Sequence, residues 1–143
     1  MSNKVNVVSA VISPKQRLLV LEKFTPRYTN VYAFHLTWAY RVTPEFEFPR
    51  GEIALVLDGY HCGDGADAAT GYLHDGNTLF TERVRPDGGL VHVTLSASDG
   101  TEPRAAGNIR LKDIVRLGDP LRLQVALVRR HATKLTPERR ELA

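Results

Sequence analysis

The residues best suited to chemistry are concentrated in one stretch of the sequence, Asp58 to Asn77. This stretch holds four aspartates with no lysine or arginine between them, two histidines, the single cysteine of the chain and five glycines. Loops longer than about 12–15 residues without secondary structure of their own are uncommon and are often functional. We therefore expect a long acidic loop here, and we predict that ligand contacts come from Asp58, Tyr60, His61, Asp64, Asp67, Tyr72, His74 and Asp75.

Two kinds of metal site would use this stretch. Its aspartates, with Asn77 and backbone carbonyls, could supply the oxygen ligands of calcium, and the protein would then resemble a calcium-dependent, lectin-like carbohydrate binder. The spacing does not match an EF-hand, however. Alternatively, His61, Cys62 and His74 with one aspartate could bind zinc or copper. The competing interpretation is that Asp and Gly only form turns, and we assign no metal ligand and no cofactor.

Catalysis by a nucleophile would depend on Cys62. Its neighbours His61 and His74 could form a thiol–imidazole pair with it, but the surrounding sequence offers no third residue that would orient the base. With only one cysteine, the chain also cannot form an internal disulfide. A non-enzymatic binding module is therefore preferred, and a metal-dependent enzyme is kept as an alternative.

The elements that must position these residues are β-strands. Residues 31–42 alternate strictly, with Trp38 among the apolar residues of one face and His35 among those of the other, which predicts one long strand with Trp38 in the core. Similar alternation marks residues 89–97 and 120–128, the latter after a Gly-Asp-Pro turn. Shorter strands are expected at residues 5–12, 52–57, 78–84 and 108–111. The run Leu18–Leu21 fits either a buried strand or a short helix.

These segments predict an all-β fold. An antiparallel β-sandwich of about 7–8 strands is the first choice and a closed barrel the second, because strands alternate with turns and no long helical pattern separates them. Thr136-Pro137-Glu138 has the composition of a helix start and predicts a possible short C-terminal helix. We expect residues 1–143 to form a single domain, with residues 129–143 as a basic C-terminal tail.

Composition limits the partners that can be considered. The formal net charge is +3, but residues 51–100 contain eight acidic and only two basic side chains. Because the basic residues are spread over many segments, nucleic acid is disfavoured as a partner, and a protein or carbohydrate partner is expected. No apolar run is long enough to span a membrane, and the N-terminus does not resemble a signal peptide.

These features predict a cytoplasmic protein, or one exported without a conventional signal. The abundance of Arg, Ala and Asp resembles bacterial sequences from GC-rich genomes. A third alternative for function is a structural assembly subunit that pairs through an exposed strand edge. Oligomeric state is not readable from the sequence.

Overall fold

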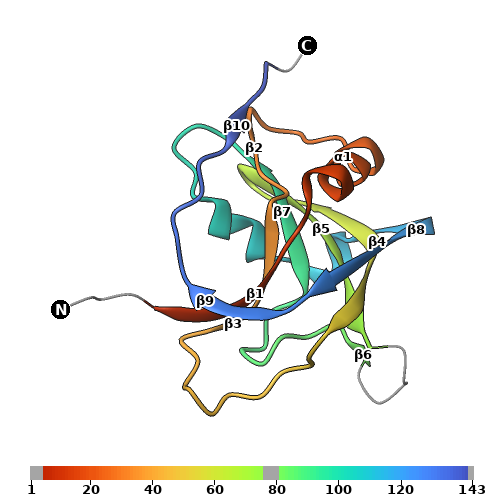
Figure 1. Cartoon of the computed structure of the whole chain (residues 1–143). Coiled ribbons are helices and arrows are strands. Elements are labelled where there is room, and N and C mark those ends of the chain that lie inside the picture. The colour runs from red at the N-terminus through yellow and green to blue at the C-terminus, as the bar shows by residue number, and fades with distance from the viewer. Residues whose placement is uncertain (1–4, 76–80, 142–143) are drawn as a thin grey trace.

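The computed structural model describes residues 5–75 and 81–141, which form two antiparallel sheets and one α-helix (Figure 1). The smaller sheet contains, in spatial order, β3 (His35–Tyr40), β1 (Asn6–Val11) and β9 (Val128–His131). The larger sheet contains, in order, β10 (Glu138–Arg139), β2 (Asn30–Val31), β7 (His92–Ala97), β5 (Ala66–His74), β4 (Glu52–Cys62) and β8 (Val115–Ala126), with β6 (Thr81–Glu82) paired to β5. The predicted all-β sandwich is confirmed, and the sheets do not close into a barrel.

The apolar run Leu18–Leu21 lies in a helix, α1 (Pro14–Lys23). The Ser13 hydroxyl accepts a hydrogen bond from the Gln16 N–H at 3.2 Å, and Pro14 stands in the first turn, where its missing N–H does no harm. The helix buries Val20 and Leu21 but leaves Leu18 65% exposed. Within the described residues, no helix has the length and apolar character needed to cross a membrane.

The expected long strand at residues 31–42 is wrong, because the chain changes sheets within it. Residue Val31 ends β2 in the larger sheet, whereas β3 begins at His35 in the smaller one. Between them Ala33 has a φ of +64°, a left-handed conformation that costs a residue with a Cβ about 1–2 kcal/mol. The kink also changes which face of the chain is in the core: Val31 and Ala33 lie in the main core before it and Leu36 and Trp38 after it, whereas Tyr32 and Phe34 belong to a second, smaller cluster. Tyr40, expected in the core, is 50% exposed.

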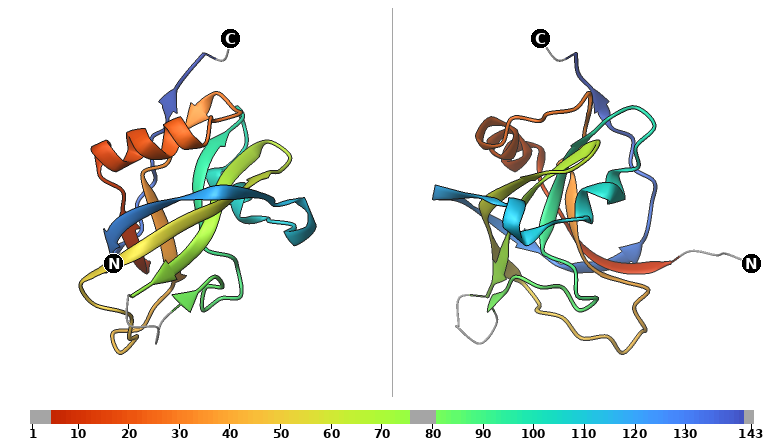
Figure 2. Two further views of the ribbon diagram at one scale, coloured as in Figure 1. Left: turned by 90° about the vertical axis from the view of Figure 1, so that its right-hand side faces the viewer. Right: turned by 180° about the vertical axis from the view of Figure 1, so that it is seen from behind.

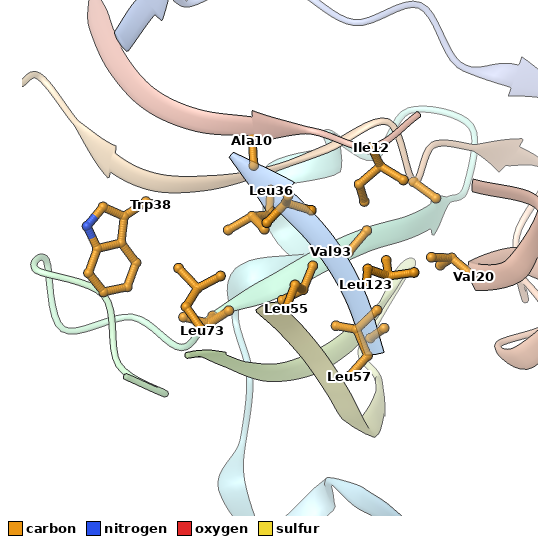
Figure 3. Close-up of a cluster of buried hydrophobic side chains, with 14 of the residues drawn as sticks. Ala10, Ile12, Val20, Leu36, Trp38, Leu55, Leu57, Leu73, Val93 and Leu123 are labelled. Carbon is orange, nitrogen blue, oxygen red and sulfur yellow. The ribbon is translucent and has the colours of Figure 1, made fainter. Parts of the chain in front are cut away.

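The main core lies between the two sheets and α1 (Figure 3). Trp38 is only 5% exposed and occupies this core, as the sequence predicted. Leu36 contributes from the same strand, and Val20 closes one end from the helix. Each such side chain adds roughly 1.5–3 kcal/mol when it is removed from water. The core therefore holds the smaller sheet firmly against the larger one.

The Asp58–Asn77 segment is not a long loop, and this prediction is also wrong. Strand β4 continues to Cys62, a short turn follows in which the Gly63 N–H donates to the Ala66 carbonyl at 2.8 Å, and β5 returns antiparallel. Residues 66–69 accordingly belong to β5. At Gly71, a Cβ would collide with the Val56 carbonyl, so this glycine permits close strand contact rather than a flexible loop. Residue Asn77 lies outside the described residues.

Smaller differences concern the C-terminal third of the chain. The Gly118–Pro120 turn forms a bulge inside β8, since Leu57 pairs with Leu121 whereas Gly59 pairs with Arg116. The expected strand at 108–111 does not form; residues 108–110 connect two short 3-10 helices, η1 (Pro103–Gly107) and η2 (Leu111–Asp113), visible from behind in Figure 2. The expected C-terminal helix is replaced by β10, because its residues pair with the free edge of β2.

Candidate functional site

Asp67, one of the predicted ligand-binding residues, is fully buried in β5. Its carboxylate accepts hydrogen bonds from the Ser96 hydroxyl, from the Tyr60 hydroxyl at 2.8 Å and from the Arg27 backbone N–H at 3.0 Å. Burial raises the pKa of this carboxyl. The pKa of Tyr60 is raised as well, by burial and by the hydrogen bond to Asp67. The Asp67 carboxylate therefore connects neighbouring strands to the chain before β2, and its acceptor sites are used within the protein.

Asp58 is paired with cations from outside the acidic stretch. Both carboxylate oxygens accept from Arg83 at 2.9 Å, and Arg116 lies 3.4 Å away. The hydrogen bonds from Arg83 hold the pKa of Asp58 below its usual value. Arg83 also lies over the Tyr72 ring, 5.0 Å from its centroid, and His74 lines the same shallow depression. The negative charge that the sequence suggested here is thus offset by arginines.

His61 and Cys62 are neighbours in sequence but contact different groups. The buried His61 ring accepts a hydrogen bond at Nε2 from the Arg110 N–H at 3.1 Å, and burial and Arg110 lower its pKa. The Cys62 sulfur lies 3.7 Å from the Tyr28 hydroxyl. The thiol–imidazole pair with His61 is therefore not formed. Asp64 is exposed in the turn, and Asp75 is half-buried after β5.

The structure gives the metal hypotheses no ligand set. Within residues 5–75 and 81–141, no three side chains of His, Cys, Asp or Glu are grouped so that they could hold a metal ion. The reason is the hairpin itself, which spreads the acidic stretch over two strands and both faces of the sheet. The eight predicted site residues are thus not brought together into one site.

A cleft of about 930 Å³ lies on another part of the molecule. It is bounded by the outer face of the smaller sheet, by β7 and η1, and by residues 132–137, which connect β9 to β10. Figure 1 shows this connection running from β9 up to β10. We call residues 132–137 the strap. The residues once expected to form a basic tail thus form β9, the strap and β10.

The strand register arranges the residues on the outer face of the smaller sheet. Val7 of β1 pairs with Tyr40 of β3 on one side and with Arg130 of β9 on the other. Because directly opposed residues share a face, these three form a row across the sheet, and all three line the cleft. A second pairing, of Val11 with His35, lies farther along the same strands. The cleft therefore has a floor of regular strands.

Positive charge exceeds negative charge in the cleft, whose ionised lining residues are Arg85, Arg104, Arg130 and Lys134 against Glu102. Only Arg85 of these cations has a carboxylate partner in the described part of the chain, Asp87 at 2.9 Å. Arg130 donates to the Ser9 carbonyl at 3.3 Å, and its Nε is buried with no hydrogen-bond partner. The cleft therefore carries cations that the described chain does not neutralise.

Two histidines add polar groups to the cleft. His92 lies with Nδ1 2.8 Å from the Leu90 carbonyl, so the ring donates there when it is neutral. Burial lowers the pKa of His92, and burial together with Arg130 lowers that of His35. Both rings are consequently neutral near pH 7 and can offer hydrogen bonds without adding charge.

Sequence reasoning missed the cleft because its residues come from distant segments. They lie at positions 7–11, 32–40, 85–94, 100–108 and 130–137, and no local spacing connects them. The available signal was the polar face of the predicted strands, where His35, Thr37, His92 and Thr94 alternate with core residues. In the sequence alone, these histidines look the same as surface or sheet-packing residues.

The chain matches no model of a protein family, no curated protein and no solved structure. The chemistry of the cleft and of the hairpin therefore carries the functional argument.

Proposed function

We propose that the protein is a non-enzymatic binding module whose ligand occupies the cleft beneath the strap. The observation that carries the proposal is the cleft itself, whose volume of about 930 Å³ lies within the usual range for ligand sites, roughly 300–1,000 Å³. The function class is the one expected from the sequence, whereas the site moves from the acidic hairpin to the cleft. The acidic residues of the hairpin are mostly engaged within the protein, as Asp58 and Asp67 illustrate.

The lining of the cleft supports a ligand with both apolar and polar parts. Val11 and Tyr40 are 56% and 50% exposed, so burying their apolar surface under a ligand would favour binding. Thr37 and His35 stand on the same strand as Tyr40 and supply hydrogen-bonding groups. Strands that pack on the core beneath them hold these groups in place, which lowers the entropy cost of binding.

The alternative functions expected from the sequence have less support. A calcium-dependent carbohydrate site would need ligands that converge, and the hairpin separates them. A cysteine nucleophile would need a base, but the side chain that the Cys62 sulfur contacts is the Tyr28 hydroxyl, at 3.7 Å. Assembly through the edge of β8 is opposed by Pro120, by the bulge, and by α1, whose Gln16 side chain donates to the Gln124 carbonyl at 2.9 Å.

The test is a fluorescence titration with N-phenyl-1-naphthylamine, an uncharged aromatic probe whose emission rises in apolar sites. We expect it to bind the native protein, and we expect Thr37→Trp, which fills the cleft, to weaken binding at least about tenfold. Val11→Trp at the exposed rim provides a second filling variant in case the first folds poorly. The control is Leu18→Trp on the exposed face of α1, outside the cleft. Equal binding by all three variants and the native protein would overturn the proposal.

A further inference from the structure

We propose that the ligand of the cleft is a small organic anion: an apolar body that carries one oxyanion group, such as a carboxylate, a sulfonate or a phosphate ester. This inference rests on the proposed function, because it names the ligand class of the same cleft. Arg130 would hold the oxyanion, the half-exposed Tyr40 would contact the apolar body, and Arg104 and Lys134 would add positive charge at the rim.

Three cations without carboxylate partners among the described residues are grouped around the cleft. Exposed arginines elsewhere are of both kinds: Arg139 pairs with Asp99 at 2.7 Å, whereas Arg41 and Arg50 have no ion pair among the described residues. Arg104, Arg130 and Lys134 also have no carboxylate within 4.0 Å in the described part of the chain, but these three differ in that they surround one hollow. Like charges that face a common, partly enclosed space create a positive potential there, which attracts an anion.

Arg130 itself has a donor that the described residues leave unsatisfied. Its backbone is fixed by pairing with Val7, and one terminal nitrogen donates to the Ser9 carbonyl at 3.3 Å. Its Nε is buried and lacks a partner, which leaves a charged donor unsatisfied. A guanidinium presents its donors as a planar fork that suits the oxygens of a carboxylate or phosphate. A ligand oxyanion would satisfy donors that the protein does not, after a small rotation of the side chain.

Tyr40, Val7 and Arg130 form a row that crosses three neighbouring strands. Adjacent strands lie about 4.8 Å apart, so the backbones that carry Tyr40 and Arg130 are separated by roughly 10 Å. The row therefore places a half-exposed aromatic ring and a cation on either side of Val7, which is itself only 5% exposed. A ligand with an apolar body and a terminal oxyanion matches that arrangement.

The experiment compares two probes that share the same aromatic rings. 1-Anilinonaphthalene-8-sulfonate carries a sulfonate, and N-phenyl-1-naphthylamine does not. We expect the sulfonate to bind the native protein at least about tenfold more tightly than the neutral probe. Raising the salt concentration from about 20 to about 500 mM should weaken only the binding of the sulfonate.

Variants assign the effect to the proposed residues. Arg130→Gln is expected to weaken the sulfonate about tenfold and to change the neutral probe less than about twofold. The double substitution of Arg104→Gln with Lys134→Gln changes only rim residues, and it should flatten the salt dependence even if Arg130→Gln folds poorly. The control is Arg122→Gln, an exposed arginine of β8 outside the cleft, which should leave both probes unchanged. Circular dichroism of each variant confirms that it is folded.

The outcomes separate this inference from the proposed function. Suppose that both probes bind with equal affinity, that Thr37→Trp weakens the binding of both, and that Arg130→Gln changes the binding of neither. The cleft then binds ligands, but the anion inference is wrong. If Thr37→Trp and Val11→Trp change neither probe, the cleft is not the site and both proposals fail. If Arg122→Gln weakens the sulfonate as much as Arg130→Gln does, the effect is one of overall charge, and the anion inference is again overturned.

Discussion

Arg17 and Glu138 form an ion pair of 3.6 Å that connects α1 to β10, the last strand of the chain. Arg17 is largely buried, its Nε donates to the Tyr32 carbonyl at 2.7 Å, and its guanidinium lies 4.4 Å from the centroid of the Phe34 ring. Strand β10 contains only two residues, and it is also held by pairing with β2 and by the ion pair between Arg139 and Asp99 at 2.7 Å. Glu138 therefore provides one of several contacts that fix the end of the strap.

We predict that Glu138→Gln loosens the strap without unfolding the protein. The substitution keeps the size of the side chain but removes the charge that faces Arg17 and Arg140. Hydrogen exchange at the backbone of residues 138–140 should accelerate several-fold, while the melting temperature changes little, because a half-exposed pair contributes about 0–1 kcal/mol. Glu141→Gln is the matched control. Equal exchange in the two variants would contradict the role assigned to Glu138.

The same contact has a predicted pH dependence. Arg140 holds the pKa of Glu138 below its usual value, so the ion pair stabilises β10 above the pKa of the unfolded chain. That contribution is lost as the pH falls through the lower, folded-state pKa. Exchange at residues 138–140 should accelerate in this acidic range in the native protein, and Glu138→Gln should remove that step. A native profile as flat as that of the variant would refute the prediction.

Asp67→Ala is predicted to destabilise the fold by about 3 kcal/mol or more, because it leaves three buried donors without their acceptor. Asp64→Ala in the same hairpin is the control; Asp64 is exposed, so its loss should change the free energy of unfolding by less than about 0.5 kcal/mol. Urea unfolding of the two variants measures the difference. A similar, small effect for both would show that the Asp67 cluster is not a structural connection.

The Asp67 carboxyl also gives a pH test of opposite sign to that of Glu138. Burial raises its pKa in the folded protein, so folding favours the protonated form. Its favourable contribution is present below the unfolded pKa and is lost as the pH rises through the folded-state pKa. The difference in unfolding free energy between the native protein and Asp67→Ala should therefore shrink as the pH rises over this range. A difference that grows with pH would contradict the assignment.

Trp38→Ala is predicted to cost about 3–5 kcal/mol, as for other large core aromatics. Tyr40→Ala, two positions along the same strand and half-exposed, should cost less than about 1 kcal/mol. Chemical denaturation compares the two, and native tryptophan emission should be shifted to short wavelength. An emission maximum close to that of free indole would place Trp38 in water instead.

Cys62 is predicted to react slowly with thiol reagents in the folded state. It is half-buried at the end of β4, and its sulfur contacts the Tyr28 hydroxyl. Tyr28→Phe removes that contact and should increase the rate of reaction several-fold, whereas Tyr72→Phe should not. Equal rates for both variants would show that Tyr28 does not restrict access to the sulfur.

The sequence predicted strands and buried side chains correctly where the pattern is local and the whole segment belongs to one sheet. The alternation at residues 91–97 predicted the buried face of β7, and the aromatic character of Trp38 predicted its burial. The β4–β5 hairpin was missed because strand pairing outweighed turn-forming composition, whereas the kink at Ala33 was missed because it interrupts a strand-forming composition. Gly71 illustrates the difficulty, since a glycine that permits close packing looks the same in sequence as one in a loop.

The candidate site could not be predicted by the same reasoning. Arg130 and Tyr40 become neighbours only through their common pairing with Val7, and neither has a motif around it. Asp58 and Asp67, by contrast, stood out as a concentration of charge, but their partners Arg83, Arg116 and Ser96 are distant in sequence. The net charge of a sequence segment therefore did not predict the charge around a ligand in the folded protein.

The claim that a small organic anion binds in the cleft is tested most directly by an NMR titration of the isotope-labelled protein with 1-anilinonaphthalene-8-sulfonate. The account predicts that the largest changes in backbone chemical shift fall in residues 7–11, 35–40 and 130–137, at a stoichiometry of one. Changes that instead concentrate around Asp58 and Tyr72 in the hairpin, or that are absent at saturating probe, would contradict it.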